Sequence, residues 1–316
     1  MRAGAPEISF VLLTDTYATI RNVLSHLRRQ SARDRLELVI VTPSPEELEL
    51  EDGVCSGLHS VQIVESELES IPRARATGIQ AARAPIVVLG ETHCYPEPDY
   101  AEALIEAHRG PWAVVGPAML NANPESLLSW AGIFLDYGPW VECKERGPMA
   151  DVPSHNGSYK RSVLLEYGPR LEEMLESDTV LNADLLSRGN ALYLESRART
   201  SHLNVSQLDV WIAERVLAGR AFAASRARRW PRGRRLAYAL GSPLIPLVRF
   251  VRILRYVRAS GRAQELLPRL LPALVVALVV SAFGEMLGYT FGVGGARRPL
   301  YEIELHRERY AGAGPG

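Results

Sequence analysis

The most informative stretch of this sequence runs Val87-Val88-Leu89-Gly90-Glu91-Thr92-His93-Cys94-Tyr95-Pro96-Glu97-Pro98. The apolar run over residues 85–89 predicts a buried strand, which Gly90 and the two prolines bring to an end. A carboxylate and an imidazole, Glu91 and His93, follow that strand directly. Ligands of an α/β sheet gather beyond the carboxyl ends of its strands, because the loops there line a crevice. The pair is therefore suited to hold a metal or a phosphate-bearing ligand, and the same pattern also fits an ordinary polar exit from a strand.

The sequence on both sides of this stretch alternates between strand and helix patterns. Short β-rich runs occur at 8–13, 36–41, 61–64, 86–89, 113–115 and 191–194, and helical patterns occur at 18–29, 72–82, 98–108, 159–167 and 175–188. This alternation predicts an α/β fold with a mostly parallel sheet flanked by helices.

Length, charge and cysteine content bound the class of protein. A chain of 316 residues is long enough for one large α/β domain with an appendage. Its net charge is zero, but 13 of the 36 basic residues are arginines between positions 215 and 262, where no acidic residue occurs. The remaining 23 basic residues face 36 acidic ones. An acidic body followed by an arginine-rich region points to a membrane surface or an acidic partner. Three cysteines without metal-ligand spacing indicate a reducing compartment.

The C-terminal third has the features of a membrane-associating region. Residues 226–235 form a basic linker, and residues 244–257 predict an amphipathic helix with arginines at every third position. The apolar run 270–284 is shorter than the ~20 residues of a spanning helix, and Glu285 interrupts it. We therefore expect two domains, 1–225 and 226–316, with the second lying at the cytoplasmic face of the cell membrane as a monotopic, re-entrant or single-pass segment. A buried helical pair packed on the catalytic domain is the soluble alternative.

Several ordered features between residues 6 and 204 resemble the family 2 glycosyltransferases, which are inverting enzymes with the GT-A fold. These features are the strand and turn 8–17, Ala74-Arg75-Ala76-Thr77-Gly78, Glu91-Thr92-His93, Tyr159-Lys160-Arg161, Ser177-Asp178 followed by Arg188-Gly189, and His202. The resemblance implies a GT-A-type sheet and transfer of a sugar, with inversion, from a nucleotide-sugar donor to a lipid-linked or cell-surface glycan acceptor. It implies no nucleic-acid partner.

The resemblance also assigns roles to residues. The donor-binding set that it implies comprises Thr14, Thr16, Tyr17, Arg75, Glu91, His155 and Asn156. The implied metal ligands are Glu91, His93 and His202, for a divalent ion such as Mn²⁺ or Mg²⁺. One carboxylate and two imidazoles suit a transition ion better than Mg²⁺, which prefers oxygen ligands. Asp178 falls on the position of the general base, and Glu176 is the alternative.

Two departures from the family pattern keep a second function open. The residues Thr42-Pro43 follow the second strand, where the family usually has an aspartate that binds uridine. The usual Asp-x-Asp has become Glu91-x-His93. The alternative function is accordingly a catalytically inactive binding or scaffold protein with a GT-A-like fold.

Overall fold

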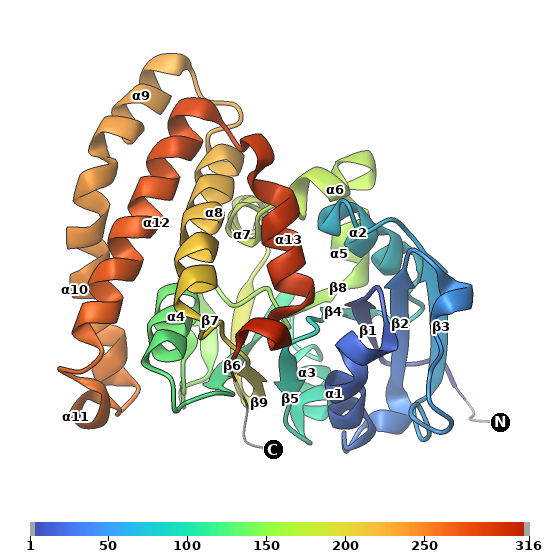
Figure 1. Cartoon of the computed structure of the whole chain (residues 1–316). Helices are drawn as coiled ribbons and strands as arrows, with labels where there is room; N and C mark the ends of the chain where they lie inside the picture. Colours follow the sequence, from blue (N-terminus) through green and yellow to red (C-terminus); the bar gives the residue numbers. More distant parts are fainter. Residues whose placement is uncertain (1–3, 313–316) are drawn as a thin grey trace. The chain divides into compact units, whose positions relative to one another are not determined.

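The structure is a computed structural model that describes residues 4–312, except for the side chain of Asp178. The described chain forms two compact units. The first comprises residues 4–120 and 143–201, and the second comprises residues 121–142 and 202–312. Figure 1 shows the strands of the first unit and the long helices of the second.

One sheet organises the first unit. Among the described residues it contains β1 (Ile8–Leu13), β2 (Leu36–Thr42), β3 (Ser60–Glu65), β4 (Ile86–Leu89), β5 (Cys94–Pro96), β6 (Val114–Asn121), β7 (Gly147–Met149), β8 (Ser158–Lys160) and β9 (Leu192–His202). The strand order is β3-β2-β1-β4-β8-β6-β9-β5, and β7 pairs with β9. The four strands from β3 to β4 are parallel, whereas β8 runs antiparallel to both β4 and β6. The predicted α/β sheet is therefore confirmed, with a parallel half and a mixed half.

Helices cover this sheet because their apolar faces match its buried strands. The first-unit helices are α1 (Tyr17–Arg28), α2 (Ile71–Ala81), α3 (Tyr100–Ala107), α5 (Arg161–Leu165), α6 (Leu171–Met174) and α7 (Asp178–Ser187). Phe10 of β1, Leu24 of α1 and Leu104 of α3 belong to one buried apolar cluster. Helix α2 packs closely, since a Cβ on Gly78 would lie 2.4 Å from a methyl carbon of Val11. The strands β1, β2 and β4 are therefore buried along their whole length, as apolar strands inside a covered parallel sheet require, whereas β3 at the sheet edge is partly exposed.

The second unit is helical. It contains α4 (Leu127–Tyr137), α8 (Leu208–Arg226), α9 (Arg232–Gly241), α10 (Ile245–Ala259), α11 (Ala263–Leu266), α12 (Leu271–Phe291) and α13 (Arg297–Leu305). Helix α12 packs along α8 and also contacts α4, α9 and α10. A buried ionic network joins α8 to its neighbours: Arg215 lies 2.8 Å from Asp136, and Glu214 lies 2.7 Å from Arg307. These contacts connect the C-terminal segment to the helices of this unit.

Two predicted helices need correction. The predicted helix 159–167 begins later, because residues 158–160 form β8 and only Arg161–Leu165 is α5. The predicted helix 175–188 is shorter, since α7 covers Asp178–Ser187. The apolar run 270–284 lies mostly within one longer helix, because α12 continues through Glu285 to Phe291. The guanidinium of Arg249 on α10 lies 3.4 Å from this carboxylate and compensates its charge.

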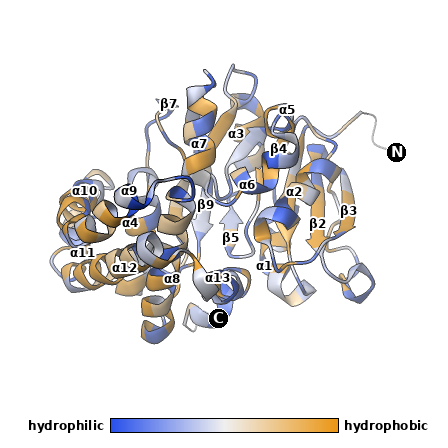
Figure 2. Ribbon diagram, turned by 90° about the horizontal axis from the view of Figure 1, so that it is seen from above, coloured by the Kyte–Doolittle hydropathy of each residue, from blue (hydrophilic) through white to orange (hydrophobic). Residues whose placement is uncertain are grey.

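Two helical stretches are long and apolar enough to cross a membrane by length and composition, Arg232–Ala259 and Leu271–Phe291. Their most apolar windows have mean hydropathies of 1.4 and 2.0, and 17% and 44% of these windows are buried. Figure 2 colours much of α10 and α12 as hydrophobic. Apolar side chains are thus left exposed on these helices, most of all in the first stretch.

Candidate functional site

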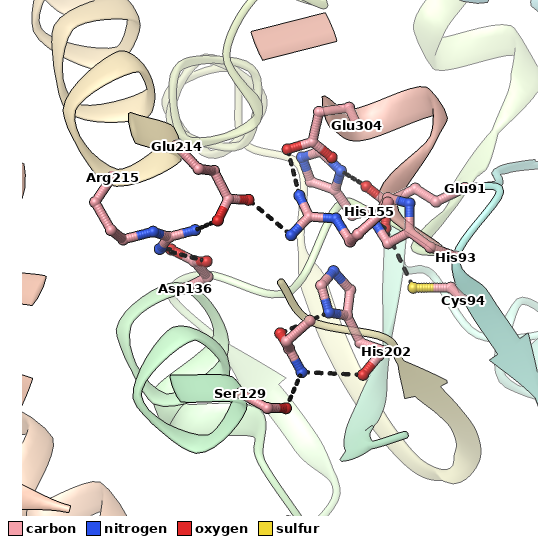
Figure 3. Close-up of polar contacts among 12 residues, drawn as sticks. Glu91, His93, Cys94, Ser129, Asp136, His155, His202, Glu214, Arg215 and Glu304 are labelled. Carbon is pink, nitrogen blue, oxygen red and sulfur yellow. Dashed lines mark hydrogen bonds and ion pairs between the residues drawn. The ribbon is translucent and has the colours of Figure 1, made fainter. Parts of the chain in front are cut away.

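Polar side chains from two segments converge on the Glu91 carboxylate, which is 6% exposed. Cys94 Sγ donates to Glu91 Oε2 over 3.2 Å, and Asn156 Nδ2 donates to the same oxygen over 3.0 Å. His93 Nε2 lies 3.7 Å from this oxygen, and His155 Nδ1 hydrogen-bonds to Oε1. Figure 3 shows Cys94 and His155 reaching Glu91. The predicted residues Glu91, His93, His155 and Asn156 therefore lie together.

Backbone hydrogen bonds bring His155 and Asn156 to Glu91, although they follow it by 64 and 65 positions in the sequence. The Asn156 N–H donates to the Leu89 carbonyl of β4 over 2.8 Å, and the Leu89 N–H donates to the Gly157 carbonyl over 3.1 Å. Asn156 adopts a left-handed φ of 54°, which asparagine tolerates better than most residues. A Cβ on Gly157 would lie only 2.4 Å from the Pro153 carbonyl oxygen. These backbone hydrogen bonds attach the turn to the end of β4, and they hold the side chains of His155 and Asn156 against Glu91.

The remaining predicted donor-binding residues lie at the same edge of the sheet. β1 and β4 are parallel with Val11 opposite Leu89, so Thr14 and Glu91 both follow the carboxyl ends of adjacent strands. Buried Thr14 donates through Oγ1 to the Thr16 carbonyl over 2.6 Å and shapes the turn into α1. Arg75 is 8% exposed in the second turn of α2.

Tyr17 begins α1, half-buried against the apolar core. Burial, followed by the neighbouring Glu51 carboxylate, raises the pKa of the Tyr17 hydroxyl. Thr16 is exposed in the turn before it. The turn predicted to bind the donor thus combines one exposed hydroxyl with one partly covered aromatic ring.

The donor atoms around Glu91 fit a divalent transition ion. Glu91, His93 and Cys94 each offer one ligand atom, and these atoms lie within 4.8 Å of one another. All three residues are buried, which removes water as a competing ligand. A carboxylate, an imidazole and a thiol match the preferences of Zn²⁺ or Co²⁺ better than those of Mg²⁺. Cys94 was not among the predicted ligands, although it is adjacent to His93 in the sequence.

Three further predicted residues belong to other elements. His202 ends β9 and belongs to the second unit, where its Nδ1 lies 2.9 Å from Asn204 Oδ1. Asp178 is the first residue of α7, and its side chain lies outside the described part of the structure. Glu176 lies between α6 and α7 and is partly exposed. The role of Asp178 or Glu176 as a base stays a prediction.

No protein-family model matches the chain, and no curated protein matches it. Among solved structures, it is similar to mannosyltransferase PcManGT from Pyrobaculum calidifontis in complex with GDP-Man and Mn²⁺, with 14% identity and a TM-score of 0.53. The match covers 90% of this chain and 88% of that one. Similarity also extends to S. aureus TarS 1–349 in complex with UDP (18% identity, 89% and 90% of the two chains, TM-score 0.46). A third similar structure is GalNAc-T7 with UDP, GalNAc and Mn²⁺ (11% identity, 64% and 44%, TM-score 0.45).

The similarity to the mannosyltransferase spans both chains almost completely, and at this identity it shows a shared fold. The protein therefore has the GT-A-type fold that its sequence predicts. Fold alone does not establish chemistry, because one fold carries many functions.

Proposed function

We propose that this protein is a glycosyltransferase that moves a sugar from a nucleotide-sugar donor to a glycan or lipid-linked acceptor, with inversion. The observation that supports it best is the cluster around Glu91. A buried carboxylate with imidazole, thiol and amide partners lies beyond the carboxyl end of a central parallel strand. That edge is where α/β sheets bind their ligands.

Transfer from such a donor releases a nucleoside diphosphate, whose developing charge needs a cation or fixed hydrogen-bond donors. In the proposed site Glu91, His93 and Cys94 would hold a divalent ion, together with His202 as predicted from the sequence. When bound, the ion would neutralise the diphosphate as a Lewis acid. Arg75 adds a guanidinium suited to bidentate phosphate contact. Thr14, Thr16 and Tyr17 contact the nucleotide.

His155 and Asn156 complete the proposed donor site. Both side chains hydrogen-bond to Glu91, so they orient its carboxylate and also leave polar atoms for sugar or phosphate oxygens.

Asp178, with Glu176 as its alternative, would accept the proton of the attacking hydroxyl. Replacing Asp178 by Asn should then lower turnover about 10²–10⁴-fold while donor affinity is kept. Turnover near the wild-type level would transfer this role to Glu176.

We further propose that the second unit binds the cytoplasmic face of the membrane through residues 226–316. Support comes from a row of exposed apolar side chains on α9, on α10 and in the turn between them, namely Leu236, Leu240, Leu244, Leu247, Val248 and Val251. Exposed arginines continue the same face at positions 252, 255 and 258. Apolar groups beside cations fit a bilayer that carries anionic lipids. Such a location would bring the enzyme to a lipid-linked or cell-surface glycan acceptor.

A panel of nucleotide-sugars tests the transferase proposal. We expect calorimetry to show that the full-length protein binds at least one nucleotide-sugar. The affinity should be higher when Mn²⁺ or Co²⁺ is present. Substituting Glu91 by Gln should weaken the metal-dependent part of this binding. Binding of a donor without hydrolysis or transfer would favour the inactive scaffold. Failure of every donor to bind, with and without metal, would contradict the transferase proposal.

A further inference from the structure

A buried polar network surrounds the imidazole of His202 in the second unit. His202 and Asn204 are each 3% exposed, and His202 Nδ1 lies 2.9 Å from Asn204 Oδ1. The Tyr137 ring packs against the imidazole with centroids 4.9 Å apart and planes tilted by 57°. A hydrogen bond and an aromatic contact therefore both help to hold the ring orientation of His202.

The backbone carbonyl of His202, which can only accept hydrogen bonds, determines the orientation of the Asn204 amide. Asn204 Nδ2 lies 3.1 Å from the backbone carbonyl oxygen of His202, so the NH₂ group must face that carbonyl. The amide oxygen is then the atom that faces the ring. Because this oxygen has no proton to give, the ring nitrogen Nδ1 must donate. In neutral imidazole only one nitrogen carries a proton, so Nε2 presents a lone pair.

Further hydrogen bonds hold Asn204 in this orientation. Its backbone N–H donates to Asn123 Oδ1 over 3.0 Å, and Asn123 Nδ2 returns a bond to the Asn204 carbonyl over 2.8 Å. Asn204 Nδ2 also reaches Asn121 Oδ1 at 3.2 Å and Ser129 Oγ at 3.1 Å. Ser129 and His202, both labelled in Figure 3, are thus partners of the same amide group. A flipped amide would set its NH₂ against the ring and its oxygen against the His202 carbonyl, and would lose these contacts.

We propose that Asn204 is a positioning residue that holds His202 in the Nδ1–H tautomer, so that Nε2 serves as a ligand for a divalent metal ion. This inference rests on the proposed function, in which His202 is one of the metal ligands. Outer hydrogen bonds of this kind fix the tautomer and direction of a ligating imidazole. Asn204 touches neither metal nor substrate in this assignment and acts through His202.

Nitrogen NMR reads the tautomer directly. The chain has seven histidines, so ¹⁵N-histidine labelling with His202→Gln as the assignment variant identifies the His202 signals. We expect wild-type protein, without added metal and at a pH where the ring is neutral, to show a protonated Nδ1 and an unprotonated Nε2. Asn204→Ala removes the acceptor and should yield a mixture of tautomers or protonation at Nε2.

Ser129→Ala is the matched control, because it removes a bond to the Asn204 amide and none to the ring. It should leave the His202 tautomer unchanged, and thermal unfolding of each variant reports any loss of fold. A protonated Nε2 in the wild type would overturn the proposal. So would an unchanged tautomer in a folded Asn204→Ala variant.

Addition of Zn²⁺ separates this inference from the proposed function. Zinc binding through Nε2 should shift that nitrogen in wild-type protein, and Asn204→Ala should weaken zinc affinity by about 10-fold or more. If the tautomer is as expected but Zn²⁺ leaves Nε2 unshifted, His202 is not a metal ligand. That result would overturn the metal role of His202 and keep the tautomer assignment.

Discussion

At the scale of single residues, the environment of Glu91 determines what its carboxylate can do. A buried carboxylate is costly unless hydrogen bonds or cations compensate it. Here a thiol and an amide donate to it, and the rings of His93 and His155 lie beside it. Carboxylate, thiol and imidazole groups can also bind metal ions, so an ion could replace the hydrogen bonds among them. The site is thus chemically suited to take a metal ion.

Cys94 gives the most specific test of that metal. If Cys94 ligates, Co²⁺ added to the protein should produce a thiolate-to-cobalt charge-transfer absorption in the near ultraviolet. Cys94→Ser should abolish this band and weaken Co²⁺ affinity about tenfold or more. Cys55→Ser is the control, since Cys55 packs against the apolar core under α1 rather than beside Glu91. A band that survives in Cys94→Ser would show that the thiol does not bind the ion.

His108 predicts a pH dependence of stability in the first unit. Burial, followed by the Lys160 cation, lowers the pKa of His108 from 6.5 to about 4, and its Nε2 hydrogen-bonds with Ser158 Oγ over 2.9 Å. The unfolded chain therefore binds a proton near pH 6.5 that the folded chain does not bind until about pH 4. The contribution of neutral His108 to the free energy of unfolding is fully present above pH 6.5 and is lost as the pH decreases toward 4.

The loss from this one group should be about 2 kcal/mol between pH 7 and pH 5. Urea unfolding of wild type and His108→Gln at both pH values measures it, because glutamine does not titrate. The wild type should lose about 2 kcal/mol more than the variant. Equal losses in the two proteins would mean that His108 is protonated in the fold.

At the scale of elements, apolar runs predicted parallel strands such as β1 and β4 well. The sequence did not predict the short polar strand β8. The predicted runs 8–13 and 86–89 coincide with β1 and β4, since buried parallel strands read as continuous apolar sequence. β8 has only three residues, and the aromatic-basic pattern of Tyr159 was interpreted as a helix. Its strand conformation depends on pairing with β4 and β6, which are distant in sequence.

The contact between α8 and α12 depends on glycines at close range. A Cβ on Gly284 would lie 2.2 Å from the Val216 carbonyl oxygen, and one on Gly288 would lie 2.4 Å from the Arg220 carbonyl oxygen. Gly219 on the facing helix approaches the Ser281 carbonyl equally closely, at 2.4 Å. Small residues spaced four apart let two helix backbones come together in this way.

We expect Gly284→Ala to destabilise the protein by about 1–3 kcal/mol, because the backbone of α8 must move to admit the methyl group. Gly233→Ala on α9 is the control, since a Cβ there meets nothing within 4 Å. That control should be neutral or slightly stabilising, as alanine favours helix. Chemical unfolding measures both. An undiminished stability of Gly284→Ala would show that the two helices are farther apart than described.

At the scale of the whole chain, sequence patterns predicted the kinds of structure better than the side-chain partners. The alternation of patterns led to the α/β fold, and the 13 arginines between positions 215 and 262 marked the C-terminal region. The hydrogen bonds of His155 and Asn156 to Glu91 could not be predicted, because they join residues 64 and 65 positions apart through a turn with a left-handed residue. Asn204 was likewise not predicted, since its role follows from hydrogen-bond geometry.

The asymmetry of charge and apolar exposure makes a final prediction about the intact protein. Leu240, Leu247 and Val248 are 73%, 67% and 68% exposed on α9 and α10, which is unfavourable in water and favourable in a bilayer interface. Each arginine near anionic lipid adds about 1 kcal/mol of attraction. Full-length protein should therefore co-sediment with anionic liposomes and bind neutral ones less.

Substitution of the apolar row should separate the two contributions. Leu247→Glu with Val248→Glu should lower liposome partitioning roughly 100-fold, because two apolar side chains no longer enter the interface. Leu208→Glu is the control, since Leu208 is also exposed, at 57%, but begins α8 outside that row. High salt should weaken wild-type binding without abolishing it, because salt screens the arginines and not the apolar contact. If wild-type protein stays in the supernatant when anionic liposomes are sedimented, the exposed apolar row of α9 and α10 does not bind a membrane.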